Sequence, residues 1–300
     1  MTRSFAPPSR RVLADCVRAA IAAPSLHNSQ PWMFRITGPA VEVRADPARR
    51  LAAADPAGRE QLISVGAAIL NLRLALRRAG YRIEVHLLPD PADPDFAARA
   101  VAVHPAPADE LTTSLAAAIP HRHTNRDEFA RVPVPAAALA RLRDAAAKED
   151  ATLTVSDPSV VAELARSADR RLRSQDDYRR ELLRWTGPEA RHDGVPGWAA
   201  GSAPMFGPHT TIMVLATDGD TPLDWLRAGQ ALQRVLLTAT LLGLATTPIS
   251  QPVEVPAVRA ALLGGSAGAC PQMVLRVGYG RVCGRSPRRA LDEVLQPEGD

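Results

Sequence analysis

Two segments that are apolar on nearly every side constrain the fold of this chain most strongly. The first covers residues 61–79, and a second of the same design lies far downstream. Gly66 and Gly80 are fourteen residues apart, as are Gly229 and Gly243, and the two pairs are offset by 163 residues. A helix that is apolar all round must be buried. The pattern therefore predicts two equivalent central helices and an internal repeat.

Shorter periodic segments surround these helices. Residues 10–22 place apolar side chains on one helical face, and residues 32–36 and 41–43 alternate as two strands of a hairpin. Interleaved helices and strands predict an α+β fold, in the form of an α/β sandwich. The same criteria predict further strands at 81–87, 152–156, 210–217 and 272–277, and helices at 135–147 and 158–184.

The composition argues against several classes of protein. Apolar residues make up 46% of the 300 residues, which is enough for a large buried core. No apolar run reaches the length of a membrane-spanning helix, the start of the chain has no apolar stretch typical of a signal peptide, and the three cysteines form no CxxC pair. The net charge of +4 comes from arginines dispersed among acidic residues, unlike the basic stripe of a nucleic-acid-binding protein. We therefore expect a cytoplasmic protein that binds neither nucleic acid nor a membrane.

Three short motifs suggest chemistry that their surroundings do not support. GGSAG at residues 264–268 matches a nucleophile elbow, but a helical segment precedes it and a strand follows, the reverse of what an elbow requires. GYGRVCG at residues 278–284 has the wrong spacing for a dinucleotide-binding loop. His121 and His123 have no third metal ligand at a useful spacing. The sequence predicts neither a catalytic side chain nor a metal site.

A long irregular stretch covers residues 185–208. It is rich in glycine and proline, shows no period and contains Trp185 and Trp198. Such a stretch inside a compact chain is usually a functional loop or else disordered. The two tryptophans favour an ordered, lid-like loop.

Two polar segments carry the remaining chemistry. APSLHNSQPW, residues 23–32, places polar side chains between two prolines in a loop that joins a helix to a strand. HRHTNRDEF, residues 121–129, follows a short helix that ends at Pro120. Its Arg122 and Arg126 could hold an anion in bidentate forks, although a solvated surface turn would have the same composition.

At these residues the chain resembles the flavin-dependent nitroreductase family. The second segment is similar to the family pattern R-x-S-x-R/K-x-F, with threonine in place of serine and Phe129 one position late. PISQ, residues 248–251, loosely resembles a P-I-E-G-type loop, and the segment around Arg288 resembles a terminal basic strand of the family. The most specific match is to P-S-x-x-N-x-Q-P-W, through Pro24, Ser25, Asn28, Gln30, Pro31 and Trp32.

The order of the two motifs departs from the family pattern. In the family the arginine segment comes first, whereas here it follows the P-S-x-x-N loop. Ordinary members are homodimers, in which each subunit gives its arginine segment to one FMN site and its loop to the other. Together with the repeat, the resemblance implies two fused units that keep one complete site. We therefore expect an internally duplicated, single-chain pseudo-dimer similar to the two-lobed, Acg-like branch, with lobes at residues 1–118 and 119–300.

The resemblance implies an FMN-dependent oxidoreductase. Its flavin would take hydride from NADH or NADPH at N5 and pass it to a nitroaromatic, a quinone or a similar small acceptor, so that no nucleophile is needed. The alternative is an FMN-binding protein for flavin storage or sequestration, whose closed lid blocks the substrate. The pseudo-dimer would act as a monomer or a weak homodimer. The cofactor-binding residues implied are Pro24, Ser25, His27, Asn28, Gln30, Arg122, His123, Thr124, Arg126, Ser250, Gln251 and Arg288.

Overall fold

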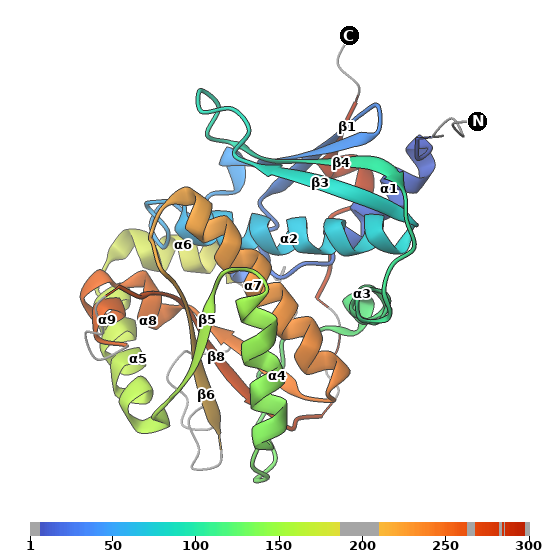
Figure 1. Ribbon diagram of the computed structural model, residues 1–300. Helices are drawn as coiled ribbons and strands as arrows, with labels where there is room; N and C mark the ends of the chain where they lie inside the picture. The colour runs from blue at the N-terminus through green and yellow to red at the C-terminus, as the bar shows by residue number, and fades with distance from the viewer. Residues whose placement is uncertain (1–6, 187–209, 263–267, 282–283, 285, 298–300) are drawn as a thin grey trace.

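The computed structural model describes residues 7–186, 210–262, 268–281, 284 and 286–297. It contains two sheets with long helices between them (Figure 1). The elements up to residue 121 are α1 (Arg10–Ala20), the 3-10 turn η1 (Leu26–Asn28), β1 (Trp32–Thr37), β2 (Ala40–Ala45), η2 (Pro47–Arg49), α2 (Arg59–Arg78), β3 (Tyr81–Leu87), β4 (Phe96–Pro105), α3 (Glu110–Ala118) and η3 (Ile119–His121). Those that follow are α4 (Ala136–Ala147), β5 (Thr152–Ser156), α5 (Pro158–Arg173), α6 (Asp176–Thr186), β6 (Thr211–Thr217), α7 (Pro222–Leu241), β7 (Ala245–Ile249), α8 (Gln251–Glu254), α9 (Pro256–Ala261), β8 (Cys270–Gly278), α10 (Leu291–Val294) and β9 (Leu295–Gln296).

The two sheets have the same topology. The first runs in the order β3-β4-β2-β1-β9, and the second in the order β7-β8-β6-β5. In each half a helix leads into two strands, the central helix follows the second strand, and two more strands complete the antiparallel order. The predicted α+β fold with an internal duplication is therefore confirmed. The short strand β9 breaks the symmetry, because it joins the first sheet parallel to β1 although it lies near the end of the chain.

The central helices α2 and α7 pack directly against each other and separate the two sheets (Figure 1). Both have 20 residues, and they begin 163 residues apart, at Arg59 and Pro222. A Cβ on Gly66 would lie 2.3 Å from the Leu226 carbonyl oxygen, and a Cβ on Gly229 would lie 2.0 Å from the Ile63 carbonyl oxygen. The glycines therefore allow a contact between helix backbones that no side chain would permit.

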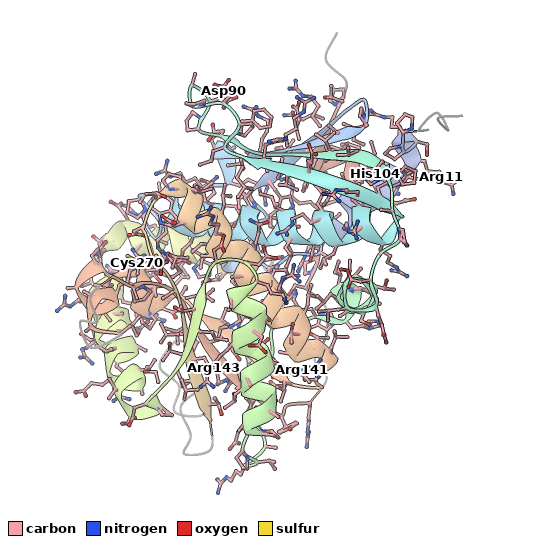
Figure 2. All side chains as sticks on the ribbon, in the orientation of Figure 1. Arg11, Asp90, His104, Arg141, Arg143 and Cys270 are labelled. Carbon is pink, nitrogen blue, oxygen red and sulfur yellow. The ribbon has the colours of Figure 1, made fainter. Side chains whose placement is uncertain are left out.

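Each central helix forms a hydrophobic core with the sheet of its own half. The first core joins α1 and α2 to the inner face of β1, β2 and β4, and it includes the fully buried Trp32 and Phe34. The second joins α4 and α7 to β5, β6 and β8. Charged side chains such as Arg11 on α1 and Arg141 and Arg143 on α4 are exposed (Figure 2). None of the described helices is long and apolar enough to cross a membrane.

The prediction of one helix over residues 158–184 is wrong. The segment forms two helices, α5 and α6, that are separated at Ser174 and Gln175. Short polar side chains compete with helical hydrogen bonding, and here the Ser174 hydroxyl donates to the Arg171 carbonyl oxygen at 2.7 Å. Three predicted features lie partly outside the described residues: the lid-like loop at 185–208 beyond Thr186, the GGSAG turn before Gly268, and residues 282 and 283 of the GYGRVCG turn.

Candidate functional site

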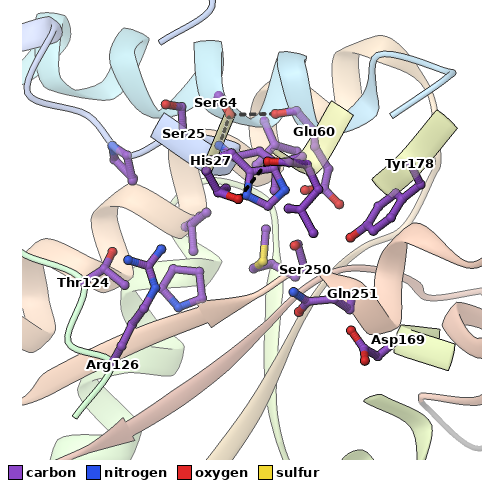
Figure 3. Close-up of a pocket in the computed structure, with 18 of the residues that line it drawn as sticks. Ser25, His27, Glu60, Ser64, Thr124, Arg126, Asp169, Tyr178, Ser250 and Gln251 are labelled. Carbon is purple, nitrogen blue, oxygen red and sulfur yellow. Dashed lines mark hydrogen bonds between the residues drawn. The ribbon is translucent and has the colours of Figure 1, made fainter. Parts of the chain in front are cut away.

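A cavity of about 1190 Å³, including its open mouth, lies where the two halves meet. Thr124 and Arg126 stand at one end of it, and Asp169 and Tyr178 stand at the other (Figure 3). The first half contributes Pro24, Ser25, Leu26 and His27 from the loop after α1, and Glu60, Ile63 and Ser64 from α2. The second half contributes Thr124, Arg126, Asp169, Arg173, Tyr178, Leu182, Thr186, Leu232, Pro248, Ser250, Gln251 and Met273.

The loop after α1 is held in an unusual backbone conformation. His27, Asn28 and Gln30 have φ values of 48°, 54° and 50°, in the left-handed region that residues other than glycine rarely adopt. The Gln30 amide donates to the Ser25 hydroxyl at 2.9 Å, which closes the loop on itself. Such conformations persist only where the surroundings enforce them, and they are concentrated at functional sites.

Asn28 and Gln30 stand behind the cavity wall and bind the C-terminal segment. The Asn28 amide donates to the Pro287 carbonyl oxygen at 3.0 Å, and the Arg288 guanidinium donates to Asn28 Oδ1 at 3.1 Å. The Arg289 amide donates to Gln30 Oε1 at 2.8 Å. Burial lowers the pKa of Arg288 to about 10. These residues thus fix the loop against the segment that leads into β9.

The arginine segment extends the edge of the second sheet. Thr124 forms a parallel bridge with Thr246 of β7, and the Asn125 amide donates to the Thr246 carbonyl oxygen at 2.9 Å. This pairing directs Thr124 and Arg126 into the cavity (Figure 3).

Arg276, a fully buried residue in the middle of β8, anchors the same segment. Its guanidinium donates to the carbonyl oxygens of Asn125 at 3.1 Å and Asp127 at 2.8 Å, and it lies 3.8 Å from the centre of the Phe129 ring. Burial lowers the pKa of Arg276 to about 10. The sequence interpretation missed this residue, although one signal was available: it is the charged side chain of a mostly apolar strand.

The cavity brings together seven of the twelve predicted cofactor-binding residues. Five of the predicted residues do not line it. Asn28 and Gln30 instead form hydrogen bonds with the C-terminal segment that contains Arg288. Arg122 is buried and His123 is half-buried, and neither lines the cavity. The seven that line it are Pro24, Ser25, His27, Thr124, Arg126, Ser250 and Gln251.

Sequence reasoning also missed two acids at this site, the buried Glu60 and the half-buried Glu254. Glu60 lines the cavity from the first turn of α2 and accepts a hydrogen bond from Arg59 at 2.8 Å. Glu254, at the end of α8, accepts from the Ser250 hydroxyl at 2.6 Å. Burial raises the pKa of Glu254 to about 7 and holds that of Glu60 well above its usual range. An acid in the first turn of a helix is ordinary in sequence, so no pattern distinguished Glu60.

The internal repeat gives this cavity a counterpart on the other side of the central helices. Residues offset by 163 from Pro248, Ser250 and Ser64 line a second surface pocket. They are Val85, Leu87 and Arg227, respectively. An apolar leucine and a cationic arginine therefore stand where the cavity has the hydroxyls of Ser250 and Ser64.

An ion-pair network occupies the counterpart pocket. Glu149 accepts from Arg73 at 2.5 Å and from Arg234 at 2.7 Å. The two halves of the chain are therefore alike in topology and different in the chemistry of their pockets. Among the residues that the structure describes, no group of three or more histidine, cysteine or acidic side chains could hold a metal ion.

Comparisons with known proteins agree with this geometry. A Mycobacterium tuberculosis protein (strain H37Rv) that is provisionally named an NAD(P)H nitroreductase is 34% identical over 320 residues, which cover 96% of this chain and 92% of that protein. Another protein of the same strain, provisionally named NAD(P)H nitroreductase acg, is 33% identical over 319 residues, or 95% of each chain.

Solved structures with a similar fold include two nitroreductases with bound FMN. The Bacteroides fragilis structure has a TM-score of 0.42 at 19% identity and covers 61% of this chain and 96% of its own. The Desulfitobacterium hafniense structure has a TM-score of 0.44 at 17% identity and covers 62% of this chain and 98% of its own.

A family model also matches directly. The model described as the nitroreductase family covers residues 119–279, more than half of the chain. Together with the relatives that match along nearly the whole length, this confirms the resemblance inferred from the loop and arginine motifs. The chain belongs to the nitroreductase family.

Proposed function

We propose that this protein is an FMN-dependent oxidoreductase that uses NADH or NADPH to reduce a small aromatic acceptor such as a quinone or a nitroaromatic. The observation that carries the proposal is the cavity between the two halves. It unites the loop of the first half with the arginine segment of the second half. The names of the relatives support a nicotinamide donor.

The residues present fit an FMN molecule. Its phosphate is a dianion that needs charge-assisted hydrogen bonds, and Arg126 and Thr124 offer them at one end of the cavity. The ring has a polar edge, and Gln251 Oε1 lines the cavity as a buried acceptor that no described donor satisfies. The faces of the ring need apolar surface, which Ile63 and Met273 contribute.

In this proposal the residues of the chain bind FMN and orient it. Ser25 and His27 approach from the first half, and Ser250 and Gln251 approach from the second, so that the cofactor is clamped between rigid elements (Figure 3). FMN, when bound, supplies the hydride chemistry. The protein therefore needs no nucleophilic side chain. We further propose that the lobes divide near residues 118 and 119 and that one chain suffices for one site.

The absorption spectrum and reduction of the purified protein test this proposal. A flavin band, followed by its anaerobic bleaching in stopped-flow measurements with NADH or NADPH, is the expected result. A bound flavin that neither donor bleaches would contradict the reductase and favour storage or sequestration. A protein that takes up no flavin on reconstitution would contradict both functions.

Arg126 offers a more specific test of the binding site. Arg126→Gln removes the guanidinium from the phosphate end of the cavity, and we expect FMN affinity to fall by about 10- to 100-fold, as for a lost charge-assisted hydrogen bond. Flavin fluorescence quenching measures the dissociation constant. Arg141→Gln, on the exposed face of α4, is the matched control and should bind as the wild type does.

A further inference from the structure

A pair of buried carboxylates lies beside the cavity, where α2, α6 and α8 meet. Glu60 is only 2% exposed and lines the cavity, while Glu254 contacts the cavity through Ser250. Glu60 Oε2 is sealed from solvent and accepts no hydrogen bond from the described residues, whereas the Glu254 carboxylate interacts with the Tyr178 hydroxyl as well as with Ser250. A buried carboxylate oxygen without a donor is costly if the group is ionised, and much less so if it carries a proton.

The charges around the pair do not compensate two ionised acids. Arg59 of α2 donates to Glu60, and its other nitrogen donates to Gln272 of β8 at 2.7 and 3.1 Å. Asp55, in the loop before α2, adds a third negative charge. Further groups that act on the pair are Arg259 of α9 and the Tyr178 hydroxyl of α6, and Asp169 of α5 acts on Tyr178.

Two neighbouring carboxylates that share one guanidinium cannot both stay ionised at low cost. The raised pKa values of Glu60 and Glu254 agree with this argument from geometry. Such a pair titrates as a unit, and its proton belongs to both residues.

Ser250 connects this pair with the substrate space. Its hydroxyl is 2.6 Å from Glu254 Oε1, and the same residue lines the cavity (Figure 3). We propose that Glu60 and Glu254 hold one exchangeable proton, which Ser250 passes to an oxygen of the acceptor that is reduced in the cavity. This inference rests on the proposed function, since it adds the proton that the hydride transfer requires.

The step balances for a quinone-type acceptor. A quinone that has taken a hydride, supplied by NADH or NADPH through the flavin, carries a negative charge on one oxygen. The Ser250 O–H bond breaks and a new O–H bond forms on that oxygen, while the Glu254 O–H bond breaks and restores the serine hydroxyl. Glu254 is left as a carboxylate and takes a proton back from water at the cavity mouth. The relay moves one proton and no electrons, and the product is the neutral hydroquinone.

Infrared difference spectroscopy tests the shared proton without any turnover. The wild type should show the carbonyl band of a protonated carboxylic acid at pH 6 that disappears by pH 9. Glu254→Gln and Glu60→Gln should each weaken this band and shift its disappearance to lower pH, because the remaining carboxylate stays buried but no longer shares Arg59 with a second acid. Glu42→Gln removes a buried glutamate that pairs with Arg35 in the first sheet, and it should keep the band. A wild type without the band, or a band that is unchanged in intensity and pH dependence in either pair variant, would overturn the proposal.

Oxidation of the reduced holo-protein by a benzoquinone tests the route. In Glu254→Gln this half-reaction should slow by about 100-fold, the lower end of what a positioned acid contributes, and its pH dependence should flatten. Ser250→Ala should slow the same step but keep the infrared band. Glu42→Gln should match the wild type.

The two proposals can fail separately. A Glu254→Gln variant that reoxidises at the wild-type rate would overturn the relay, while the reductase function would stand. A wild type that neither NADH nor NADPH reduces would instead contradict the proposed function, and the infrared band would still decide whether the pair holds a proton.

Discussion

Arg276 shows how a single residue far from solvent can shape a binding site. It does not line the cavity, yet its guanidinium holds the backbone on both sides of Arg126. A buried guanidinium is expensive to desolvate, and three acceptor oxygens, from Asn125, Asp127 and the Thr247 hydroxyl, offset that cost. We infer that its role is to position the arginine segment.

Replacing Arg276 should therefore weaken cofactor binding from a distance. Arg276→Met fills a similar volume but removes the guanidinium donor to the Asp127 carbonyl oxygen and one of the two donors to the Asn125 carbonyl oxygen, which keeps the Thr247 hydroxyl, at a total cost of about 1–3 kcal/mol. We expect FMN affinity to fall at least tenfold and the midpoint of urea unfolding to decrease. Arg35→Met removes a half-exposed arginine of the first sheet and serves as the control. Unchanged FMN affinity in Arg276→Met would contradict the positioning role.

The Glu254 carboxyl should make the stability of the protein depend on pH. Its pKa rises from 4.5 in the unfolded chain to about 7 in the folded protein. Between these values the folded state holds more protons than the unfolded state, so stability is full below pH 4.5 and falls as the pH rises through about 7. Glu254→Gln should reduce this dependence, with the buried Glu60 keeping the remainder, and raise the free energy of unfolding at pH 8 by about 1–3 kcal/mol. Urea unfolding at several pH values measures this dependence, with Glu42→Gln as the control. If the free energy of unfolding changes with pH equally in the wild type, Glu254→Gln and Glu42→Gln, this prediction is wrong.

At the scale of elements, periodicity predicted what local patterns can encode. The bounds of β5 were predicted correctly, and the two central helices were found with their repeat, because buried apolar runs and terminal glycines are local signals. The break between α5 and α6 was missed, because no glycine or proline at Ser174 and Gln175 interrupts the helical pattern. Strand β9 could not be predicted from two residues, since its pairing with β1 depends on a contact far along the chain.

The candidate site divides in the same way. The loop and the arginine segment were found through their motifs, but Glu60, Glu254 and Arg276 become significant only through their neighbours in space. A buried charge has no sequence period of its own, so only the folded structure reveals what compensates it.

The crossing of α2 and α7 makes a separate prediction about stability. In Gly66→Ala the new Cβ would meet a backbone carbonyl oxygen at 2.3 Å, so the two helices must move apart. We expect a loss of roughly 1–3 kcal/mol or more in the free energy of unfolding, as for other overpacked cores. Gly284→Ala, where nothing lies within 4 Å of the new Cβ, should change stability little. Equal unfolding midpoints for the two variants would show that the helices are not in such close contact in solution.

At the scale of the whole molecule, duplication has produced two halves with different tasks. The first half presents the strained loop and the second half presents the arginine segment to the same cavity. On the opposite side, Leu87 stands where Ser250 stands in the cavity, and Glu149 is locked between two arginines. A flavin ring would meet Leu87 there in place of the serine hydroxyl. The symmetry of the fold thus does not extend to the chemistry of its pockets.

This asymmetry predicts one FMN per chain. Reconstitution with excess FMN, followed by gel filtration and comparison of flavin absorbance with protein concentration, should give a ratio of about one. Arg126→Gln should lower the ratio at limiting FMN, since it weakens the cavity's phosphate end. Glu149→Gln should leave it at one, because loosening the ion pairs does not restore a hydroxyl at Leu87. A ratio of two in the wild type would mean that the counterpart pocket also binds flavin, and the division of labour between the halves would have to be abandoned.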